Sequence, residues 1–460
     1  MSPVESAPNN THVSEPAKDA HEALAHSFDD AKGGVSLAPL NPAFELQLLK
    51  VGHTLSELAA LLIDGRALWD IRTFNCQDLP WAASFPALAS CVLALEDEAL
   101  EALDASQDTL YETLRPALET DLRQAGLSWN SALFTWRLTE LNGTQQLSAA
   151  LLPERQLSRF AAGIKGRKWE QISRFAAALS QSPTPYPVLE WCAGKGHLGR
   201  LVGAVSHKPV LSLEWQAQLC QDGEKEAQKR GVNQRFVCAD AFSGEAELLQ
   251  GEQHALALHA CGELHLVLLR RAAAAQTSAI SLSPCCYHLI QGEQYAGLSA
   301  SARATGLVMD KHGLQLPLNH SVVASAKENQ DRLKEVQWRL GFDSLQRHLR
   351  GEDTYLPLPS LRQSQLSGSF DAFCRWACEL KGVPLPEDFG GEPWLALGRQ
   401  RQRLTRRLDL VAHLFRPVIE QYLLLDRAAY LLEAGYRVSL SAFCPAEVTP
   451  RNALIDARRP

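Results

Sequence analysis

Apolar residues in the middle of the chain follow two alternating spacings, short continuous runs and i, i+3, i+4 repeats. The runs predict buried strands and the repeats predict helices, and their alternation is typical of a parallel sheet with helical crossovers. Two further apolar runs follow a long helical pattern over residues 408–432, in which Pro417 is expected to kink or interrupt the helix. The expected strands cover 187–191, 209–215, 234–240, 254–260, 278–286, 436–443 and 453–458. The pattern therefore predicts an α/β fold with a seven-stranded, Rossmann-like sheet.

The remaining residues divide by composition and by apolar spacing. Residues 1–40 contain few apolar side chains and are expected to form a disordered tail. Residues 41–150 carry mainly helical spacing, which predicts a helical accessory domain. The sheet core is expected to cover 151–299, and the last helix and strand pair are expected to cover 406–460. Residues 300–405, which mix short apolar pieces with polar and proline-rich segments, are interpreted as an insertion between them.

A glycine-rich turn follows the first expected strand. Gly194, Gly196 and Gly199 fit the pattern G-x-G-x-x-G and stand where a helix begins. Glycine permits a tight turn and a close approach of the backbone to a ligand, although the pattern alone is weak. Glu190 ends the same strand, where a carboxylate would repel a pyrophosphate but would accept a hydrogen bond from an amine.

Acidic residues also end the second and third expected strands. The carboxyl ends of parallel strands form the ligand-binding edge of such sheets, so Glu214 is placed to accept from ribose hydroxyls and Asp240 from an adenine amine. Trp215 and Phe242 stand beside these acids and could pack on the base. Each acid alone is equally well explained as a helix N-cap. Three acids in phase with the glycine turn favour S-adenosylmethionine. The predicted cofactor contacts are Glu190, Cys192, Gly194, Gly196, Glu214, Trp215, Asp240, Ala241 and His259.

Several segments resemble known methyltransferases. EWCAGKGHLG resembles motif I of class I methyltransferases, which depend on S-adenosylmethionine. ALHACG (257–262) and SPCCYHLIQ (283–291) look like the methyltransferase domain of glutathione S-transferase C-terminal domain-containing proteins. LLLDRAAYLLEAGY and FCPAEVTPRNALI resemble the end of methyltransferase-like proteins of the rRNA adenine dimethylase domain-containing group.

The resemblance covers about 160–300 and 408–457 and implies a class I methyltransferase sheet. It places the cofactor at the three acids and the glycine turn, with the backbone near His259 and Ala260 beside the methionine part. It also implies that Ser283 to His288 face the methyl acceptor. The chain lacks the Asn-Pro-Pro-Tyr box of nucleic-acid amino-methyltransferases, because Pro284–Tyr287 follows the fifth strand and not the fourth. This difference argues against adenine-N6 chemistry.

The cysteines and histidines near these strand ends allow three interpretations. Cys261 with Cys285 or Cys286 is similar to the two-cysteine layout of pyrimidine C5 methyltransferases, although the expected acid is missing. The same cysteines with His259 and His288 have metal-ligand types, but adjacent cysteines fit one tetrahedral ion poorly. Otherwise the cysteines pack as small apolar residues while Tyr287 and His288 shape the acceptor pocket. We predict no metal, and the predicted catalytic residues are His259, Cys285, Cys286, Tyr287 and His288. His259 would accept a proton from the acceptor or bond a backbone carbonyl.

Charge and composition bear on the partner. The chain is 46% hydrophobic and 21% charged, with a net charge of −7, which disfavours indiscriminate coating of nucleic acid. Two local basic clusters are each explained either by a solvated helix face or by contact with RNA phosphates. The first cluster is Lys165, Arg167 and Lys168. The second cluster is Arg399, Arg401, Arg403, Arg406 and Arg407.

These features lead to one predicted function and several rivals. The 11 scattered cysteines, without an apolar leader or a membrane-length apolar run, favour a cytoplasmic protein that does not contact membranes. We expect an S-adenosylmethionine-dependent methyltransferase that acts on a macromolecule, with RNA as the leading acceptor and protein as the next. An inactive methyltransferase fold that binds a partner through its N-terminal helices, and an oxidoreductase, are the alternatives.

Overall fold

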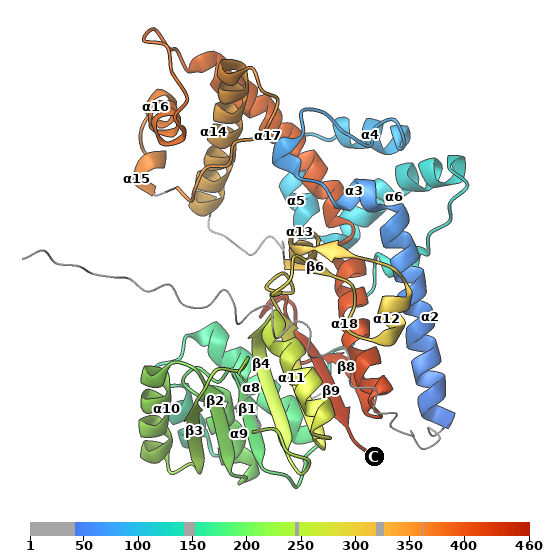
Figure 1. Cartoon of the computed structure of the whole chain (residues 1–460), viewed down its shortest axis with the longest axis vertical. Helices are drawn as coiled ribbons and strands as arrows, with labels where there is room; N and C mark the ends of the chain where they lie inside the picture. The colour runs from blue at the N-terminus through green and yellow to red at the C-terminus, as the bar shows by residue number, and fades with distance from the viewer. Residues whose placement is uncertain (1–41, 142–151, 244–247, 319–325, 362) are drawn as a thin grey trace, which may run out of the picture. The chain divides into compact units, whose positions relative to one another are not determined.

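The computed structural model describes residues 42–141, 152–243, 248–318, 326–361 and 363–460 (Figure 1). Ala43–Pro460 form one unit of mutually contacting elements. The predicted disordered tail, residues 1–40, lies outside the described residues.

The centre of the fold is the predicted seven-stranded sheet. Its strand order is β3-β2-β1-β4-β5-β9-β8. The first five strands in that order are parallel, whereas β9 is antiparallel to both β5 and β8. The strands are β1 Val188–Trp191, β2 Val210–Glu214, β3 Gln234–Cys238, β4 His254–Cys261, β5 Ala279–Cys285, β8 Arg437–Ala442 and β9 Ala453–Arg458. The sheet confirms the predicted class I methyltransferase topology, with a switch point where β1 lies between β2 and β4.

Helices cover the sheet because its central strands are apolar on both faces. Every residue of β1 and β5 is buried, as expected for parallel strands with helices on each side. On one face, α8 and α9 share a hydrophobic cluster with the strands, in which the Phe175 and Phe443 rings meet edge to face at 5.3 Å. The crossover helices are α8 Gly166–Gln181, α9 His197–Ser206, α10 Ala217–Arg230 and α11 Glu263–Ala274, with α7 Glu154–Ala161 before them.

The predicted N-terminal helical region is present. Its longest helix, α2, meets the length and composition of a membrane span over Glu45–Asp64, with a mean hydropathy of 1.3. Core helices of soluble proteins, which are mostly buried, also meet those criteria, whereas 28% of this window is buried, including Leu55, Leu58 and Leu62. The expectation of no membrane contact stays a prediction. The helices are α2 Pro42–Asp64, α3 Arg66–Trp69, α4 Pro86–Leu93, α5 Ala99–Ala105 and α6 Gln107–Gln124.

The segment between β5 and the last two strands is mostly helical. Its long helices α14 and α17 lie side by side (Figure 1), and α16 adds Phe370 and Phe373 to a separate hydrophobic cluster around Trp338. The predicted boundary at 405/406 falls inside α17. The elements are β6 Gln294–Tyr295, α12 Ala300–Ala304, β7 Met309–Asp310, α13 Lys311–Gln315, α14 Ala326–Arg350, α15 Gln363–Leu366, α16 Phe370–Lys381 and α17 Glu392–His413.

The long helix predicted over 408–432 is interrupted, as Pro417 suggested. Helix α17 ends at His413 and α18 Arg416–Glu433 begins with Pro417 in its first turn, where its missing N–H costs nothing. Asp426 and Arg427 of α18 are buried ionic anchors. Asp426 accepts from the Leu298 and Ser299 amides at 2.8 Å, and Arg427 donates to His265 Nε2 at 3.0 Å. These contacts fix the loops that follow β4 and β5.

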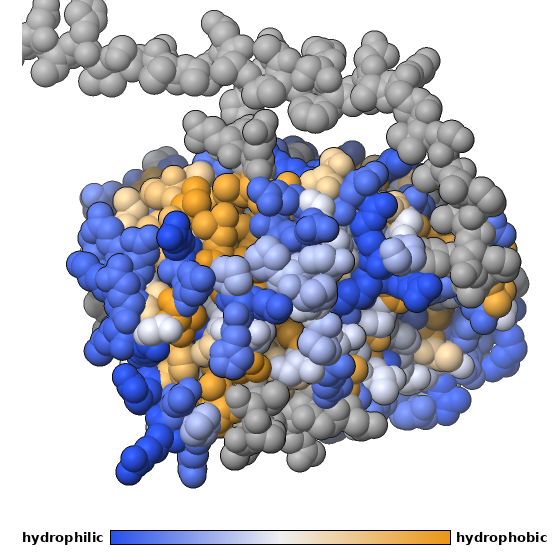
Figure 2. All heavy atoms as spheres, turned by 90° about the horizontal axis from the view of Figure 1, so that it is seen from below, coloured by the Kyte–Doolittle hydropathy of each residue, from blue (hydrophilic) through white to orange (hydrophobic). Residues whose placement is uncertain are grey.

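The molecular surface mixes polar and apolar residues. Seen from below the view of Figure 1, patches of hydrophobic residues are bordered by hydrophilic ones (Figure 2). This distribution is ordinary for a folded surface, so the fold alone does not locate a site.

Candidate active site

The glycine turn after β1 leaves open space beside Gly194, called the hollow below. Gly194 and Gly196 have φ angles of 57° and 65°, in the left-handed region that glycine adopts without strain. A Cβ atom at Gly194 would meet nothing within 4 Å, whereas one at Gly196 would collide with Gln234 and Phe236. The first glycine therefore faces free space and the second permits close packing of the turn on the sheet.

Glu214 closes the hollow from the end of β2. Its Oε2 accepts a hydrogen bond from the Gly194 amide at 2.9 Å, and its Oε1 accepts from the Gln216 amide at 3.1 Å. Trp215 next to it is 70% exposed. The structure thus brings the glycine turn and this acid together, with an unpacked aromatic side chain at the rim.

The end of β3 supports both interpretations of Asp240. Its carboxylate is exposed, and Oδ1 accepts from the Phe242 amide at 2.9 Å, which is a local capping contact. Phe242 is 40% exposed, whereas Ala241 between them is buried. An open hollow, a carboxylate at each of two neighbouring strand ends and two exposed aromatic rings fit an adenosine group, so these residues suit S-adenosylmethionine.

Glu190 does not point into the hollow. Its side chain is 3% exposed, and its Oε2 accepts from Ser212 Oγ at 2.7 Å and from Gln234 Nε2 at 3.3 Å. Burial raises the pKa of this carboxyl group, against the effect of the Ser212 hydrogen bond. The expected contact of Glu190 with a methionine amine, direct or through water, stays a prediction, because these bonds occupy Oε2 alone. This oxygen joins β1, β2 and β3 beneath the turn, and a Cβ at Gly199 would collide with it.

Backbone strain gathers at the strand ends. Among the described residues, Cys192, His259 and Cys286 are non-glycine residues in the left-handed region, with φ angles of 56°, 63° and 48°. Cys192 and Cys286 directly follow β1 and β5, and His259 lies in the last part of β4. Each such conformation costs about 1–3 kcal/mol and persists only where the surrounding structure enforces it. The register of β4 also shifts between Leu258 and Ala260, so a bulge re-aims His259.

His259 is held by a side-chain amide and not by a backbone carbonyl. Its Nε2 lies 2.8 Å from Gln171 Oε1 of α8, which assigns the proton to Nε2 and leaves Nδ1 as the basic nitrogen. Burial lowers the pKa of His259 to about 4, and the charges of Arg451 and Lys168 act in the same direction. The ring is therefore neutral near pH 7, and its role as a general base stays a prediction.

Three cysteine sulfurs meet at the ends of β4 and β5. Cys261 Sγ lies 3.4 Å from Cys285 Sγ, and the sulfurs of Cys261, Cys285 and Cys286 all lie within 4.8 Å of one another. The hydrogen bond from Cys285 lowers the pKa of Cys261 to about 6, although burial opposes it. The pKa of Cys285 is raised by the same contact. The adjacency of Cys285 and Cys286 therefore does not keep their sulfurs apart.

Tyr287 and His288 differ in their surroundings. Tyr287 is 2% exposed, and the Arg427 guanidinium carbon lies 5.1 Å from the centre of its ring, so it packs in the interior and does not shape an open pocket. Its hydroxyl has no partner among the described residues. His288 is partly buried, its Nδ1 also lacks a partner there, and burial lowers its pKa.

Sequence analysis missed three residues near the site. Arg451 precedes β9, and its charge lowers the pKa of His259, Cys261 and His288. Gln171 positions the His259 ring. Glu420 lies on α18, where burial raises its pKa to about 7. Only Arg451 could have been found from the sequence, because it lies in the segment FCPAEVTPRNALI, which resembles the end of methyltransferase-like proteins. Glu420 and Gln171 lie on helices, and the apolar spacing of those helices does not single out either residue.

The first basic cluster lies beside this site. Lys165, Arg167 and Lys168 are exposed at the start of α8. Lys168 stands one helical turn before Gln171, on the same face of the helix, and Gln171 bonds His259 at the tip of β4. The charge of Lys168 also lowers the pKa of His197, after burial and Arg200.

Two of the five arginines of the second basic cluster are buried, and the contact of this cluster with RNA stays a prediction. Arg401 and Arg407 are each 8% exposed. Arg401 donates to Asp343 Oδ2 at 2.6 Å and to the Phe74 carbonyl at 2.8 Å. Arg407 donates to Asp97 Oδ1 at 2.8 Å and to the Val92 carbonyl at 3.0 Å.

The other arginines of the second cluster also have partners. Arg399 pairs with Glu392 at 2.6 Å, Arg403 pairs with Asp97 at 2.7 Å, and Arg406 donates to the Asp97 carbonyl at 3.2 Å. The cluster therefore joins α17 to the N-terminal helices and to α14.

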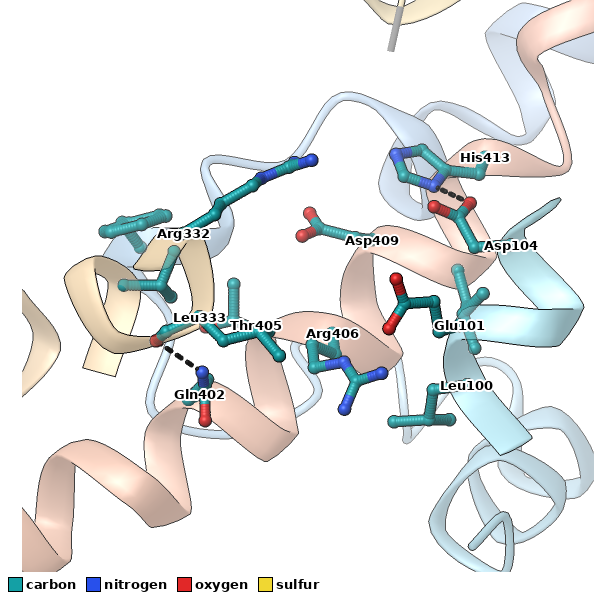
Figure 3. Close-up of a pocket in the computed structure, with 13 residues that line it drawn as sticks. Leu100, Glu101, Asp104, Arg332, Leu333, Gln402, Thr405, Arg406, Asp409 and His413 are labelled. Atoms are coloured by element: carbon teal, nitrogen blue, oxygen red, sulfur yellow. Dashed lines mark hydrogen bonds and ion pairs between the residues drawn. The ribbon is translucent and has the colours of Figure 1, made fainter. Parts of the chain in front are cut away.

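A cavity of about 170 Å³ lies beside the second cluster (Figure 3). Asp409 faces it, and burial raises the pKa of that carboxyl group. Beside it, His413 Nδ1 lies 2.5 Å from Asp104 Oδ1. Arg406 lies between Glu101 and the residues of α14 that line the cavity (Figure 3). Ligand pockets are usually larger, about 300–1,000 Å³. The charged groups here serve the contact between α17 and its neighbours.

Comparison with known proteins finds similarity to methyltransferases. A methyltransferase domain family model matches residues 167–293, which contain the glycine turn and the ends of β1 to β5. Among solved structures, TrmN from Thermus thermophilus is 16% identical, with a TM-score of 0.24 over 31% of this chain and 47% of TrmN. This chain thus spans about half the length of TrmN.

Two further solved structures are similar at the same level. Magnesium protoporphyrin IX methyltransferase from Synechocystis, with bound SAH, is 14% identical, with a TM-score of 0.22 over 28% of this chain and 64% of its own. Coclaurine N-methyltransferase, bound to N-methylheliamine and SAH, is 13% identical, with a TM-score of 0.24 over 72% and 95%. Residues 167–293, which match the methyltransferase domain family, contain the glycine turn and β1 to β5 of the sheet.

Proposed function

We propose that this chain is an S-adenosylmethionine-dependent methyltransferase and that it methylates RNA. The observation that carries the proposal is the position of the first basic cluster, because Lys168 lies one turn from Gln171 and Gln171 is bonded to His259. Cations that border the tips of the strands can hold the phosphates of an RNA whose base or ribose enters the site. The finer resemblance of the chain to the rRNA adenine dimethylase domain-containing group supports the same acceptor class.

The first basic cluster destabilises the N-terminus of α8, and this supports a binding role for the cluster. Lys165, Arg167 and Lys168 occupy the N-cap and first turn of α8, which contains no acidic residue there. The positive end of the helix dipole disfavours cations at this place by about 0.3–1 kcal/mol each. Cationic side chains that the helix dipole disfavours are well placed to bind an anionic partner, which the helix N-terminus also attracts.

The residues at the strand tips would act mainly by positioning. The cofactor supplies an electrophilic methyl group when it is bound. Glu214 would hold the ribose, and the Gly194 turn would let the backbone approach the rest of the cofactor. The strained backbone at Cys192, His259 and Cys286 fixes the tips of three strands, so that an acceptor atom is aligned without further reorganisation.

Transfer of label from the cofactor identifies the acceptor. The full chain is incubated with radiolabelled S-adenosylmethionine and the RNA and protein fractions of a deletion strain. We expect label in RNA. Label in the protein fraction alone would instead establish a protein methyltransferase, and cofactor binding without label in either fraction would remove both acceptors.

A charge-matched pair of variants tests the basic cluster. Lys165→Ala/Arg167→Ala/Lys168→Ala should raise the KM for RNA while the affinity for S-adenosylmethionine stays unchanged. The control removes the same charge at Lys225, Lys229 and Arg235, which are exposed on α10 and β3. An equal change in both triple variants would contradict a specific contact.

A further inference from the structure

We propose that Cys261, Cys285 and Cys286 bind a single zinc ion at the carboxyl ends of β4 and β5. The proposal is independent of which molecule accepts the methyl group. It concerns a site for a soft divalent cation, built from three sulfurs. Two of them belong to Cys261 and Cys285, which are 24 positions apart in the sequence and are brought together by the sheet.

The sulfurs have the spacing that a tetrahedral ion requires. Zinc–thiolate bonds are about 2.3 Å long, so two sulfurs on one tetrahedral ion lie about 3.8 Å apart. Cys261 Sγ and Cys285 Sγ are 3.4 Å apart, and no pair in the group exceeds 4.8 Å. Small side-chain rotations would equalise these distances.

The backbone explains how two adjacent cysteines reach the same point. Cys261 and Cys285 are register partners in β4 and β5, so their side chains leave the sheet side by side. Cys286 follows with a φ angle of 48°, a conformation that strands do not adopt. This left-handed residue turns the chain back, and its sulfur joins the other two. A strained residue that completes a cluster of ligand atoms is the arrangement expected where strain serves a function.

Charge and access also suit a cation with thiolate ligands. Binding would release to solvent the protons that the thiols still carry and give a group of net charge −1, namely Zn²⁺ with three thiolates. The guanidinium of Arg451 acts electrostatically on Cys261 and Cys286 and would offset that charge. Cys261 and Cys286 are only partly buried, so an ion can enter from solvent.

The fourth coordination position is open to a small molecule or to the acceptor. Among the described residues, no histidine or carboxylate places a ligand atom within 4.8 Å of all three sulfurs. Three protein ligands and one exchangeable position are typical of catalytic zinc sites, whereas structural sites have four protein ligands. The ion would therefore be able to hold a water molecule or a thiol next to the methyl-transfer site.

Cobalt substitution tests the site without measuring activity. The reduced full chain is freed of metal with a chelator and titrated with Co²⁺ alone. We expect one equivalent to bind, with thiolate-to-cobalt charge-transfer absorption that Zn²⁺ abolishes. Cys286→Ser should weaken binding by more than about 100-fold, because loss of a ligand exceeds the effect of losing an outer contact. Cys374→Ser, in a buried cysteine of α16, is the matched control.

Each outcome decides the proposal. A folded wild-type protein without charge-transfer absorption would overturn it, and so would absorption that Cys286→Ser retains. Cys285→Ser supplies a second test if Cys286→Ser does not fold. Addition of a small thiol should change the cobalt spectrum. An unchanged spectrum would show a fourth protein ligand and overturn the open position.

Discussion

The two basic clusters of this chain differ in burial and in the partners of their side chains. Lys165, Arg167 and Lys168 are exposed on the first turn of α8 beside the methyl-transfer site. Arg401 and Arg407 are buried on α17, where they donate to carboxylates and to backbone carbonyls of the N-terminal helices and α14. Basic residues in sequence thus indicate a charge, and only the packing partner decides whether that charge binds a ligand or stabilises the fold.

The difference follows from what lies opposite each helix. Asp97 and Asp343 face α17, and paired acids let guanidinium groups enter the interior. The first turn of α8 has no acid of its own and faces solvent. Arginine also suits the first environment better than lysine, because its planar group satisfies several acceptors at once.

The largest expected effect comes from removing a buried guanidinium. Arg407→Ala should lower the free energy of unfolding by about 1–3 kcal/mol, because the Val92 and Leu95 carbonyls lose a charged donor while Asp97 keeps only Arg403 as an ion-pair partner. Lys168→Ala, the matched control, should change stability by less than about 0.5 kcal/mol. Urea unfolding of the three proteins checks this. Equal stability of both variants would remove the distinction between the clusters.

The cofactor site should respond independently of both clusters. Glu214→Ala should weaken binding of S-adenosylmethionine by about 10- to 100-fold, the value of a hydrogen bond to a charged group. The triple alanine variant of the first cluster should bind the cofactor with unchanged affinity. Isothermal titration measures both. Unchanged affinity in Glu214→Ala would argue against the placement of the cofactor at this acid.

Arg403 provides a smaller test inside the second cluster, because 65% of its side chain is exposed. Its pair with Asp97 lies at the surface, so Arg403→Ala should cost no more than about 1 kcal/mol of stability. RNA affinity should not change. A loss of RNA binding as large as that of Lys168→Ala would return α17 to the RNA-binding surface.

The smallest expected effect is a pH dependence of stability that comes from Asp104 and its partners His413 and Arg416. Burial raises the pKa of Asp104, but the hydrogen bond with His413 and the charge of Arg416 together hold it below its ordinary value of 3.8. A depressed carboxyl pKa contributes stability above the unfolded value that is lost as pH falls through the folded value. Stability should therefore fall below about pH 4 more steeply in wild type than in Asp104→Asn. Parallel curves from urea unfolding between pH 5 and 3 would contradict this.

The sheet was predictable because its strands are short, apolar and separated by turn residues. The positions of Glu214, which ends β2, and of the glycine turn at one edge of the sheet could also be predicted from sequence, since the carboxyl ends of parallel strands share that edge. The inward orientation of Glu190 could not, because Ser212 and Gln234 lie on other strands and nothing in the sequence links them. The partners of Arg401 and Arg407 could not be predicted for the same reason, since they lie more than 50 residues away.

The salt dependence of RNA binding tests the central claim most directly. Each phosphate contact by a lysine or arginine contributes about 0.7–0.9 to the slope of log affinity against log salt. Fluorescence titrations of a labelled RNA at several salt concentrations should give the Lys165→Ala/Arg167→Ala/Lys168→Ala variant a slope about 2–3 smaller in magnitude than wild type. Identical slopes would show that the first cluster contacts no phosphate and would contradict the account.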